Sequence, residues 1–293
     1  MPETEKTVGV PLGVCWNITG RCNGSCRFCY RSTARELPLD TNLTILRDLV
    51  RAGVRKISWA GGEPTMYPGL VPLVEEAKDR GVTTSITSNA TPLATAFLKS
   101  YHHLFDWITL PLDSLSAGIQ RSLGRPADHV DQVLSLLEFL SRTEAAKLKI
   151  NTVFTAMNTA AINGIPTKIA GFGVTRWKLF RFLPSRGNAR RNRLHFEVDD
   201  SAFAHGCDDL KRICEGFPAL RLTFVDTCDY EDAHLSVEPN GEVQKYVAGS
   251  YRRCGNLVTD GLAGVLSDAA VSSLAIARRY ERVPGLLGTS IEV

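Results

Sequence analysis

The sequence has no apolar run that approaches the roughly 18 residues of a membrane-spanning helix, so we expect no membrane association. The net charge is only +3 over 293 residues, which is too small to indicate a nucleic acid polymer as a partner. Residues 1–7 are polar and lack the apolar core of a signal peptide. The sequence contains no repeat of fixed period and no low-complexity tract. The length allows one large domain or two small ones, each with a buried core.

Three of the eight cysteines lie in one short segment. Cys22, Cys26 and Cys29 have the spacing C-x3-C-x2-C and follow an apolar run that predicts a strand. Short spacings of this kind let one loop supply thiolates to an iron–sulfur cluster. Three ligands leave one iron of a four-iron cluster open, and an open metal position can bind another molecule.

Other interpretations of the cysteine loop stay open at this point. Cys26-x-x-Cys29 alone would suit a zinc loop or a redox pair, and the thiols could also be purely structural. A zinc loop normally has a fourth ligand nearby, whereas the next histidine is His102. Because three cysteines are committed to one loop, we expect a reducing compartment, the cytoplasm, rather than disulfides.

Strand and helix patterns alternate from residue 13 to about residue 183, which predicts an α/β fold with a parallel sheet and helices on its outer face. The expected strands are residues 13–19, 55–60, 83–88, 107–112, 148–155 and 176–183. The expected helices are residues 40–51, 69–80, 92–101, 127–141 and 159–169.

Two motifs together resemble those of the radical S-adenosylmethionine (SAM) enzymes. In the cysteine loop, Phe28 occupies the aromatic position before the last cysteine, and residues 59–64, Trp-Ala-Gly-Gly-Glu-Pro, are similar to the family's Gly-Gly-Glu-Pro segment. The resemblance implies a partial (β/α)6 barrel with ligands at the C-terminal ends of its strands. It also implies two cofactors, a [4Fe–4S] cluster and SAM, and an external one-electron reductant such as flavodoxin. Reductive cleavage of SAM would yield a 5′-deoxyadenosyl radical that takes hydrogen from the substrate.

The resemblance further implies which residues contact SAM. In the family the Gly-Gly-Glu-Pro segment holds the amino group, an arginine holds the carboxylate, and backbone after the sixth strand contacts adenine. Asn89 could equally form a simple turn, and Arg125 could be a solvated surface residue. The residues assigned to SAM are Phe28, Gly61, Gly62, Glu63, Ser88, Asn89, Asp113, Arg125 and Leu183.

A narrower resemblance, over roughly residues 13–185, is to viperin and its bacterial relatives, which act on CTP. The patterns Lys149-Ile-Asn151-x-Val and Arg176-Trp-Lys178-x-Phe are similar to segments that hold the triphosphate in that family. Arg176 and Lys178 are two residues apart and share one face of a strand. Inward-facing cations are costly unless paired, so a small anionic substrate is favoured over charges that cap strand ends or pair with acids on the outer face.

The chain also departs from viperin. Cys15 stands where we align a viperin asparagine, and residues 186–193 contain four arginines. That basic loop could hold a phosphate or be mobile and solvated. We therefore expect a nucleotide, a sugar nucleotide or a related biosynthetic intermediate rather than CTP in particular.

The expected domains are a tail (1–12), the barrel (13–195) and a C-terminal α+β extension that covers the barrel (196–293). In the extension we expect a helix at 199–216, a strand at 221–226, a hairpin at 235–243 and a helix at 268–282. Four cysteines lie there, and single buried thiols are the default interpretation. A second cluster would instead indicate a peptide- or sugar-modifying enzyme, and a sensor or zinc module would not cleave SAM. These cysteines are Cys207, Cys214, Cys228 and Cys254.

Replacing Cys22, Cys26 or Cys29 by alanine is expected to abolish the brown colour of the cluster and the formation of 5′-deoxyadenosine, because each thiolate holds one iron. Absorbance of the anaerobically reconstituted protein and chromatography of its products measure the two losses. Wild-type-like SAM cleavage in any one variant would contradict the assignment.

Overall fold

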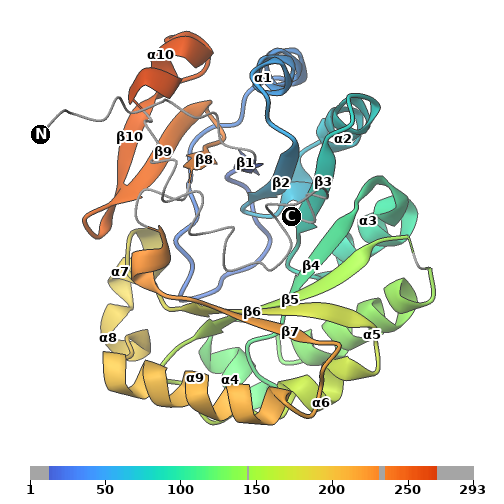
Figure 1. The fold of residues 1–293 in the computed structure, drawn as a ribbon, viewed down its shortest axis with the longest axis vertical. Helices are drawn as coiled ribbons and strands as arrows, with labels where there is room; N and C mark the ends of the chain where they lie inside the picture. Colours follow the sequence, from blue (N-terminus) through green and yellow to red (C-terminus); the bar gives the residue numbers. More distant parts are fainter. Residues whose placement is uncertain (1–12, 144, 231–234, 269–293) are drawn as a thin grey trace, which may run out of the picture.

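The computed structural model describes residues 13–143, 145–230 and 235–268 (Figure 1). Ten strands within these residues form one sheet in the order β10-β9-β8-β1-β2-β3-β4-β5-β6-β7. Their bounds are β1 (Gly13–Thr19), β2 (Lys56–Gly61), β3 (Thr83–Thr87), β4 (Trp107–Pro111), β5 (Lys147–Phe154), β6 (Val174–Arg181), β7 (Arg221–Val225), β8 (Leu235–Val237), β9 (Glu242–Val247) and β10 (Ser250–Asn256).

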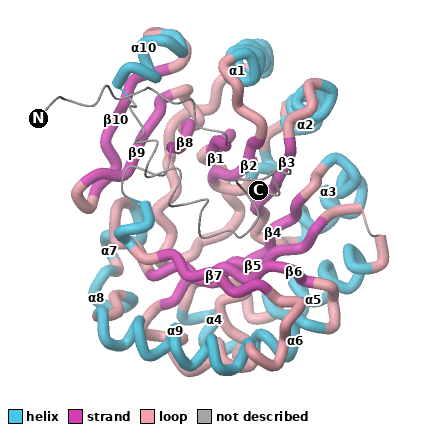
Figure 2. The backbone as a smooth tube through the Cα atoms, in the orientation of Figure 1, coloured by secondary structure: helices cyan, strands magenta, loops and turns pink. Residues whose placement is uncertain are grey.

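The sheet curves into an open barrel with helices around its convex side, as the tube in Figure 2 shows. The longer helices are α1 (Leu39–Arg51), α2 (Leu70–Asp79), α3 (Pro92–Tyr101), α5 (His129–Ser141), α9 (Asp200–Cys214) and α10 (Gly261–Asp268). Shorter ones are α4 (Ala117–Ser122), α6 (Ile165–Ala170), α7 (Gly187–Arg191), α8 (Arg193–Phe196) and the 3-10 turns η1 (Pro64–Met66), η2 (His102–Leu104) and η3 (Thr227–Tyr230). No helix in the described ranges is long and apolar enough to cross a membrane.

Alternation along the strands explains why the main core lies between the sheet and the helices. In β5, Leu148, Ile150 and Phe154 are buried and belong to this core, while the alternate residues Lys149, Asn151 and Val153 are only half-buried. β1 repeats the pattern, and its Trp16 stacks on Trp59 of β2 at 5.4 Å between ring centroids. Successive side chains of a strand point to opposite faces, so the half-buried positions face the inside of the barrel.

The expected α/β fold is confirmed, and all six expected strands are present and parallel to their neighbours. The sheet extends further than expected at both sides. β7 adds to β6 and β8 adds to β1, both in parallel, so the sheet continues past the domain boundary expected at residue 195. The expected hairpin is also present, as antiparallel β8 and β9.

The helix expected at 159–169 is wrong in its first half, because residues 156–164 form turns and α6 begins at Ile165. The Asn158 side chain accepts a hydrogen bond from the Thr155 backbone N–H and donates one to the Asp113 carbonyl. Such side-chain bonds to the backbone compete with helix formation, and Pro166 suits the first turn of the shorter helix. The helix expected at 268–282 lies outside the described residues, apart from Asp268.

Leu210 of α9 is fully buried, whereas Leu194 of α8 is 91% exposed. Leu210→Ala should lower the free energy of unfolding by about 2–5 kcal/mol through the lost burial and the cavity it leaves. Leu194→Ala should change the same quantity by no more than about 0.5 kcal/mol. Denaturant unfolding of the cluster-free protein measures both, and equal effects would show that α9 does not pack as described.

Candidate active site

The cysteine loop follows β1 and is held against the end of β2 by the backbone. Gly62 N–H donates to the Thr19 carbonyl and Glu63 N–H donates to the Arg21 carbonyl, each at 2.7 Å. A Cβ atom on Gly61 or Gly62 would collide with the backbone of Thr19 or Arg21. The glycine pair is therefore needed because two backbone segments touch here.

The three cysteines of the loop are free and half-buried. The Cys22 sulfur accepts from Gly24 N–H at 3.3 Å, and the Cys29 sulfur accepts from Arg31 N–H at 3.4 Å. Burial raises the pKa of the Cys26 and Cys29 thiols, while the charge of Arg125 on Cys26 and the Arg31 N–H on Cys29 act in the opposite direction. N–H donors and a nearby cation stabilise thiolates, which are the form that binds iron.

This donor set fits an iron–sulfur cluster. Across the described ranges, no three His, Cys, Asp or Glu side chains are arranged to hold a single metal ion. Thiolates that each bind a different iron of one cluster need not converge on one point, whereas a zinc ion would need its ligands to do so.

Glu63 organises the rim between β2 and β3. Its side chain is fully buried; Oε2 accepts from Asn89 N–H at 2.6 Å and Oε1 accepts from the Thr65 hydroxyl at 2.8 Å. Burial raises the pKa of Glu63, and these hydrogen bonds counteract it. The carboxylate thus fixes the backbone of Asn89.

Asn89 forms the turn that we considered and also approaches the cysteine loop. Its Oδ1 accepts from Thr91 N–H at 3.0 Å, and its Nδ2 lies 3.7 Å from the Cys22 sulfur. The adjacent Ser88 is buried. The two interpretations of Asn89 are therefore compatible.

Arg125 is not a surface residue. Its Nε lies 2.7 Å from Asp113 Oδ2, and the two side chains are 8% and 1% exposed. Burial tends to lower the pKa of Arg125, but the charges of Cys26 and Asp113 raise it. The guanidinium lies over the Phe28 ring, 5.4 Å from its centroid. The structure thus places a fixed cation beside the cysteine loop.

Leu183 lies where β6 ends and is buried among aromatic side chains, including Tyr230 and Tyr246. Its carbonyl accepts from Ser185 N–H at 2.9 Å. The backbone at this rim position is therefore turned by a local hydrogen bond.

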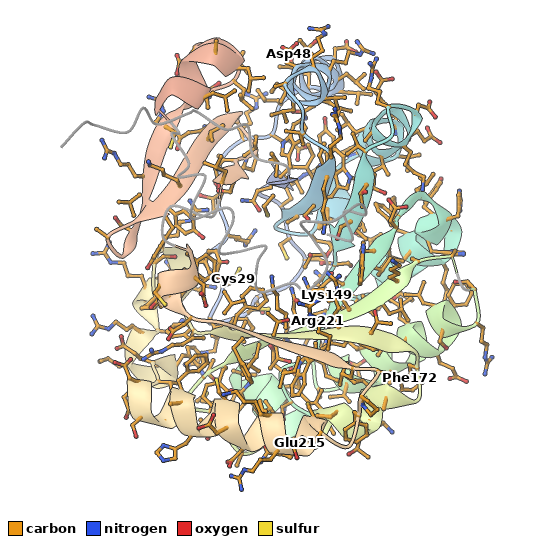
Figure 3. All side chains as sticks on the ribbon, viewed as in Figure 1. Cys29, Asp48, Lys149, Phe172, Glu215 and Arg221 are labelled. Carbon is orange, nitrogen blue, oxygen red and sulfur yellow. The ribbon has the colours of Figure 1, made fainter. Side chains whose placement is uncertain are left out.

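The basic residues of β5 and β6 occupy inward-facing positions. Lys149 is in register with Arg176, and Asn151 is in register with Lys178. Figure 3 shows Lys149 on the concave side of the sheet, the same side as Cys29. The alternative, that these charges lie on the outer helical face, is wrong.

Sequence reasoning missed Arg221, which is in register with Arg176 and completes a row across three adjacent strands. Figure 3 shows it on the same side of the sheet as Lys149, whereas Phe172 and Glu215 lie on the other side. The strand at 221–226 was expected, but nothing in the sequence indicated which strand it would pair with.

The buried oxygens Thr109 Oγ1 and Asn151 Oδ1 have no hydrogen-bond partner in the described structure. Thr109 is in register with Lys149, so the row also has an unused polar group beside it.

The basic segment 186–193, which could hold a phosphate or be mobile and solvated, folds into α7 and the first residue of α8. Arg186 Nη2 lies 3.2 Å from the Glu238 carboxylate and Arg193 Nε lies 2.7 Å from Glu197, while Arg190 and Arg191 are exposed. The arginines near a carboxylate are thus neutralised by the chain itself.

The four cysteines of the C-terminal part are distributed over three elements. Cys207 and Cys214 lie on α9, Cys228 lies in η3 and Cys254 lies on β10. Figure 1 shows α9 and β10 at opposite sides of the molecule. This arrangement does not form a second cluster site.

Comparisons with known proteins agree with this geometry. The model of the radical SAM superfamily matches residues 16–161. An S-adenosylmethionine-dependent nucleotide dehydratase from Lacinutrix mariniflava is 27% identical over 78% of this chain and 49% of its own length. A protein of the same name from Flammeovirga pacifica is 32% identical over 57% of this chain and 61% of its own length. The chain thus spans about half and three fifths of these relatives.

The solved structure of Streptococcus suis SuiB bound to S-adenosylmethionine is similar to this chain, with a TM-score of 0.70 and 17% sequence identity. The match covers 92% of this chain and 68% of the SuiB chain. At this identity the likeness shows the fold alone. Together with the family match and the curated relatives, it confirms the expected barrel. The chain belongs to the radical SAM superfamily, whose cofactors are a [4Fe–4S] cluster and S-adenosylmethionine.

Proposed function

We propose that this enzyme uses the 5′-deoxyadenosyl radical to take hydrogen from a small anionic substrate, either a nucleotide, a sugar nucleotide or a related biosynthetic intermediate. The inward row Lys149, Arg176 and Arg221, with Lys178 above it, is the observation that supports this most directly. The name of the curated relatives, nucleotide dehydratase, points to the same substrate class.

The charge of the row favours a phosphate group. Neighbouring strands are about 4.8 Å apart, so the row brings three positive side chains close together inside the barrel. Three positive side chains at such distances attract a strongly negative group more than a single one would. Arginine binds phosphate oxygens in a bidentate manner, and lysine adds a point charge.

The depth of the row favours an elongated substrate. β5 runs on for four residues from Lys149 to Val153, next to its C-terminal end. At the usual rise per residue this places Lys149 about 13 Å below the rim of the barrel. The cysteine loop lies at the C-terminal ends of the strands. A substrate that contacts both needs an anionic tail separated from its reacting carbon, as in a nucleoside di- or triphosphate.

The proposed SAM site uses the rim residues. Glu63 and the Gly61-Gly62 backbone would hold the amino group, Arg125 the carboxylate and the backbone at Leu183 the adenine. Ser88, Asn89, Asp113 and Phe28 would support these contacts. Asp113 already fixes the Arg125 side chain through Nε, so the two terminal nitrogens of the Arg125 guanidinium are pre-oriented for a carboxylate. An external one-electron donor such as flavodoxin and a cytoplasmic location belong to the same proposal, with no polymer or membrane partner.

A peptide- or sugar-modifying enzyme with an auxiliary cluster is the alternative. The fold likeness to SuiB does not decide it, and the separation of the four C-terminal cysteines disfavours a second cluster. Iron content equivalent to one cluster per chain would support the nucleotide proposal, and content equivalent to two would support the alternative.

Arg125→Ala should weaken SAM binding about 10- to 150-fold, because a charge-assisted hydrogen bond contributes roughly 1.5–3 kcal/mol. It also leaves Asp113 buried without its partner, which should lower stability by about 3–5 kcal/mol. The double variant Arg125→Ala/Asp113→Asn should recover stability but not SAM affinity, as measured by thermal unfolding and equilibrium binding. Unchanged SAM affinity in Arg125→Ala would limit Arg125 to its pairing with Asp113.

A panel of nucleoside mono-, di- and triphosphates and sugar nucleotides tests the substrate class. With reconstituted enzyme and dithionite, one class should stimulate 5′-deoxyadenosine formation. Lys178→Ala should then raise the concentration of that compound needed for half-maximal stimulation by about 10- to 150-fold.

The matched control for this experiment is Lys168→Ala, because Lys168 is exposed on α6 at the outer face. It should leave the response unchanged. Stimulation by a peptide and by no phosphorylated compound would overturn the proposal. So would a Lys178→Ala enzyme that responds like the control.

A further inference from the structure

The segment Arg186–Asn192 makes a set of hydrogen bonds that neither the family motifs nor the proposed substrate explains. Four backbone carbonyls between residues 26 and 30, in the cysteine loop and directly after it, accept hydrogen bonds from this segment. The pairs are Asn188 Nδ2 to Cys26 O at 3.0 Å, Asn192 Nδ2 to Arg27 O at 2.9 Å, Ala189 N to Cys29 O at 3.1 Å and Arg186 Nε to Tyr30 O at 2.7 Å.

Local backbone geometry makes this contact possible. Gly187 has a φ of +60°, a left-handed value that glycine adopts without strain. The chain turns there and enters α7 with the Ala189 N–H directed at Cys29 O. A Cβ atom on Gly187 would lie 3.4 Å from the same carbonyl, so the segment approaches the loop closely.

The cysteine loop has little structure of its own with which to hold its ligands. Residues 20–38 contain neither helix nor strand. A loop of this kind spreads unless its backbone is held from outside. Carbonyls that are withdrawn from water require partners, and the segment Arg186–Asn192 supplies them on both sides of Cys29.

Arg186 connects the same loop to the C-terminal hairpin. Its Nη1 donates to Gln244 Oε1 at 2.9 Å, and its Nη2 lies 3.2 Å from both Glu238 oxygens. Glu238 is buried and also accepts from Asn17 of β1 at 3.0 Å. One guanidinium therefore joins the loop after Cys29 to β1 and to the β8–β9 turn.

We propose that residues Arg186, Asn188 and Asn192 are positioning residues that hold the cysteine loop in its ligand-ready conformation and thereby set how long the cluster is retained. Through Arg186 and Glu238, retention also depends on the C-terminal hairpin. This assignment rests on the family and not on the identity of the substrate.

The test compares iron release to a chelator from anaerobically reconstituted Asn188→Ala, Asn192→Ala and Arg186→Lys enzymes. The control is Arg190→Ala, which alters an exposed side chain of the same helix. Each lost hydrogen bond should speed release about fivefold, and the double asparagine variant should exceed either single one. Arg186→Lys keeps a positive charge near Glu238 but lacks the Nε–H that bonds Tyr30 O, so it should also release iron faster.

Two further measurements separate this role from a general structural one. Thermal unfolding of the cluster-free variants should match that of Arg190→Ala, and the electron paramagnetic resonance spectrum of the reduced cluster should broaden. Iron release at the control rate would overturn the proposal, as would faster release that merely follows a lower melting temperature. If Asn188→Ala does not fold, Asn188→Asp, which keeps the size and removes the donor, replaces it under the same criteria. Because no substrate is present in these assays, failure of the nucleotide proposal would not affect them.

Discussion

Lateral register between parallel strands is the constraint on which the site depends. It brings every strand's C-terminal end to one rim, where the cysteine loop and the Gly61-Gly62-Glu63 segment meet backbone to backbone. The same register carries Lys149, Arg176 and Arg221 onto one inward row. A one-residue slip would turn this row toward the helices, and the apolar residues between these positions prevent such a slip.

The local parts of this arrangement could be predicted from the sequence, because they depend on residues a few positions apart. The cysteine triplet, the alternation in β5 and the hairpin at 235–243 each depend on residues that are close together in the sequence. Pairings between segments that are distant in the sequence could not be predicted in this way. Arg221 joined the cationic row only because β7 adds to β6, and Arg186 met Glu238 although 52 residues separate them.

Two residues show how a motif can predict the position of a side chain and still miss the contacts that the side chain makes within the protein. Glu63 was expected to face SAM, and its carboxylate also fixes the Asn89 backbone inside the protein. Arg125 was weighed against a surface residue, yet it forms a buried pair with Asp113. In both cases the motif predicted the position, while the surrounding hydrogen bonds depended on segments that no short pattern specifies.

The pairing of β1 with β8 has a consequence for the order in which the molecule forms. β1 is the first described strand to be synthesised. Its partner on one edge, β8 (Leu235–Val237), is synthesised more than two hundred residues later. Contacts of such separation form late, so one edge of β1 stays open during most of synthesis, and open edges recruit other chains. The cysteine loop next to it also waits for residues 186–192. Cluster insertion should therefore follow synthesis of most of the chain, and nascent chains are the form most exposed to aggregation.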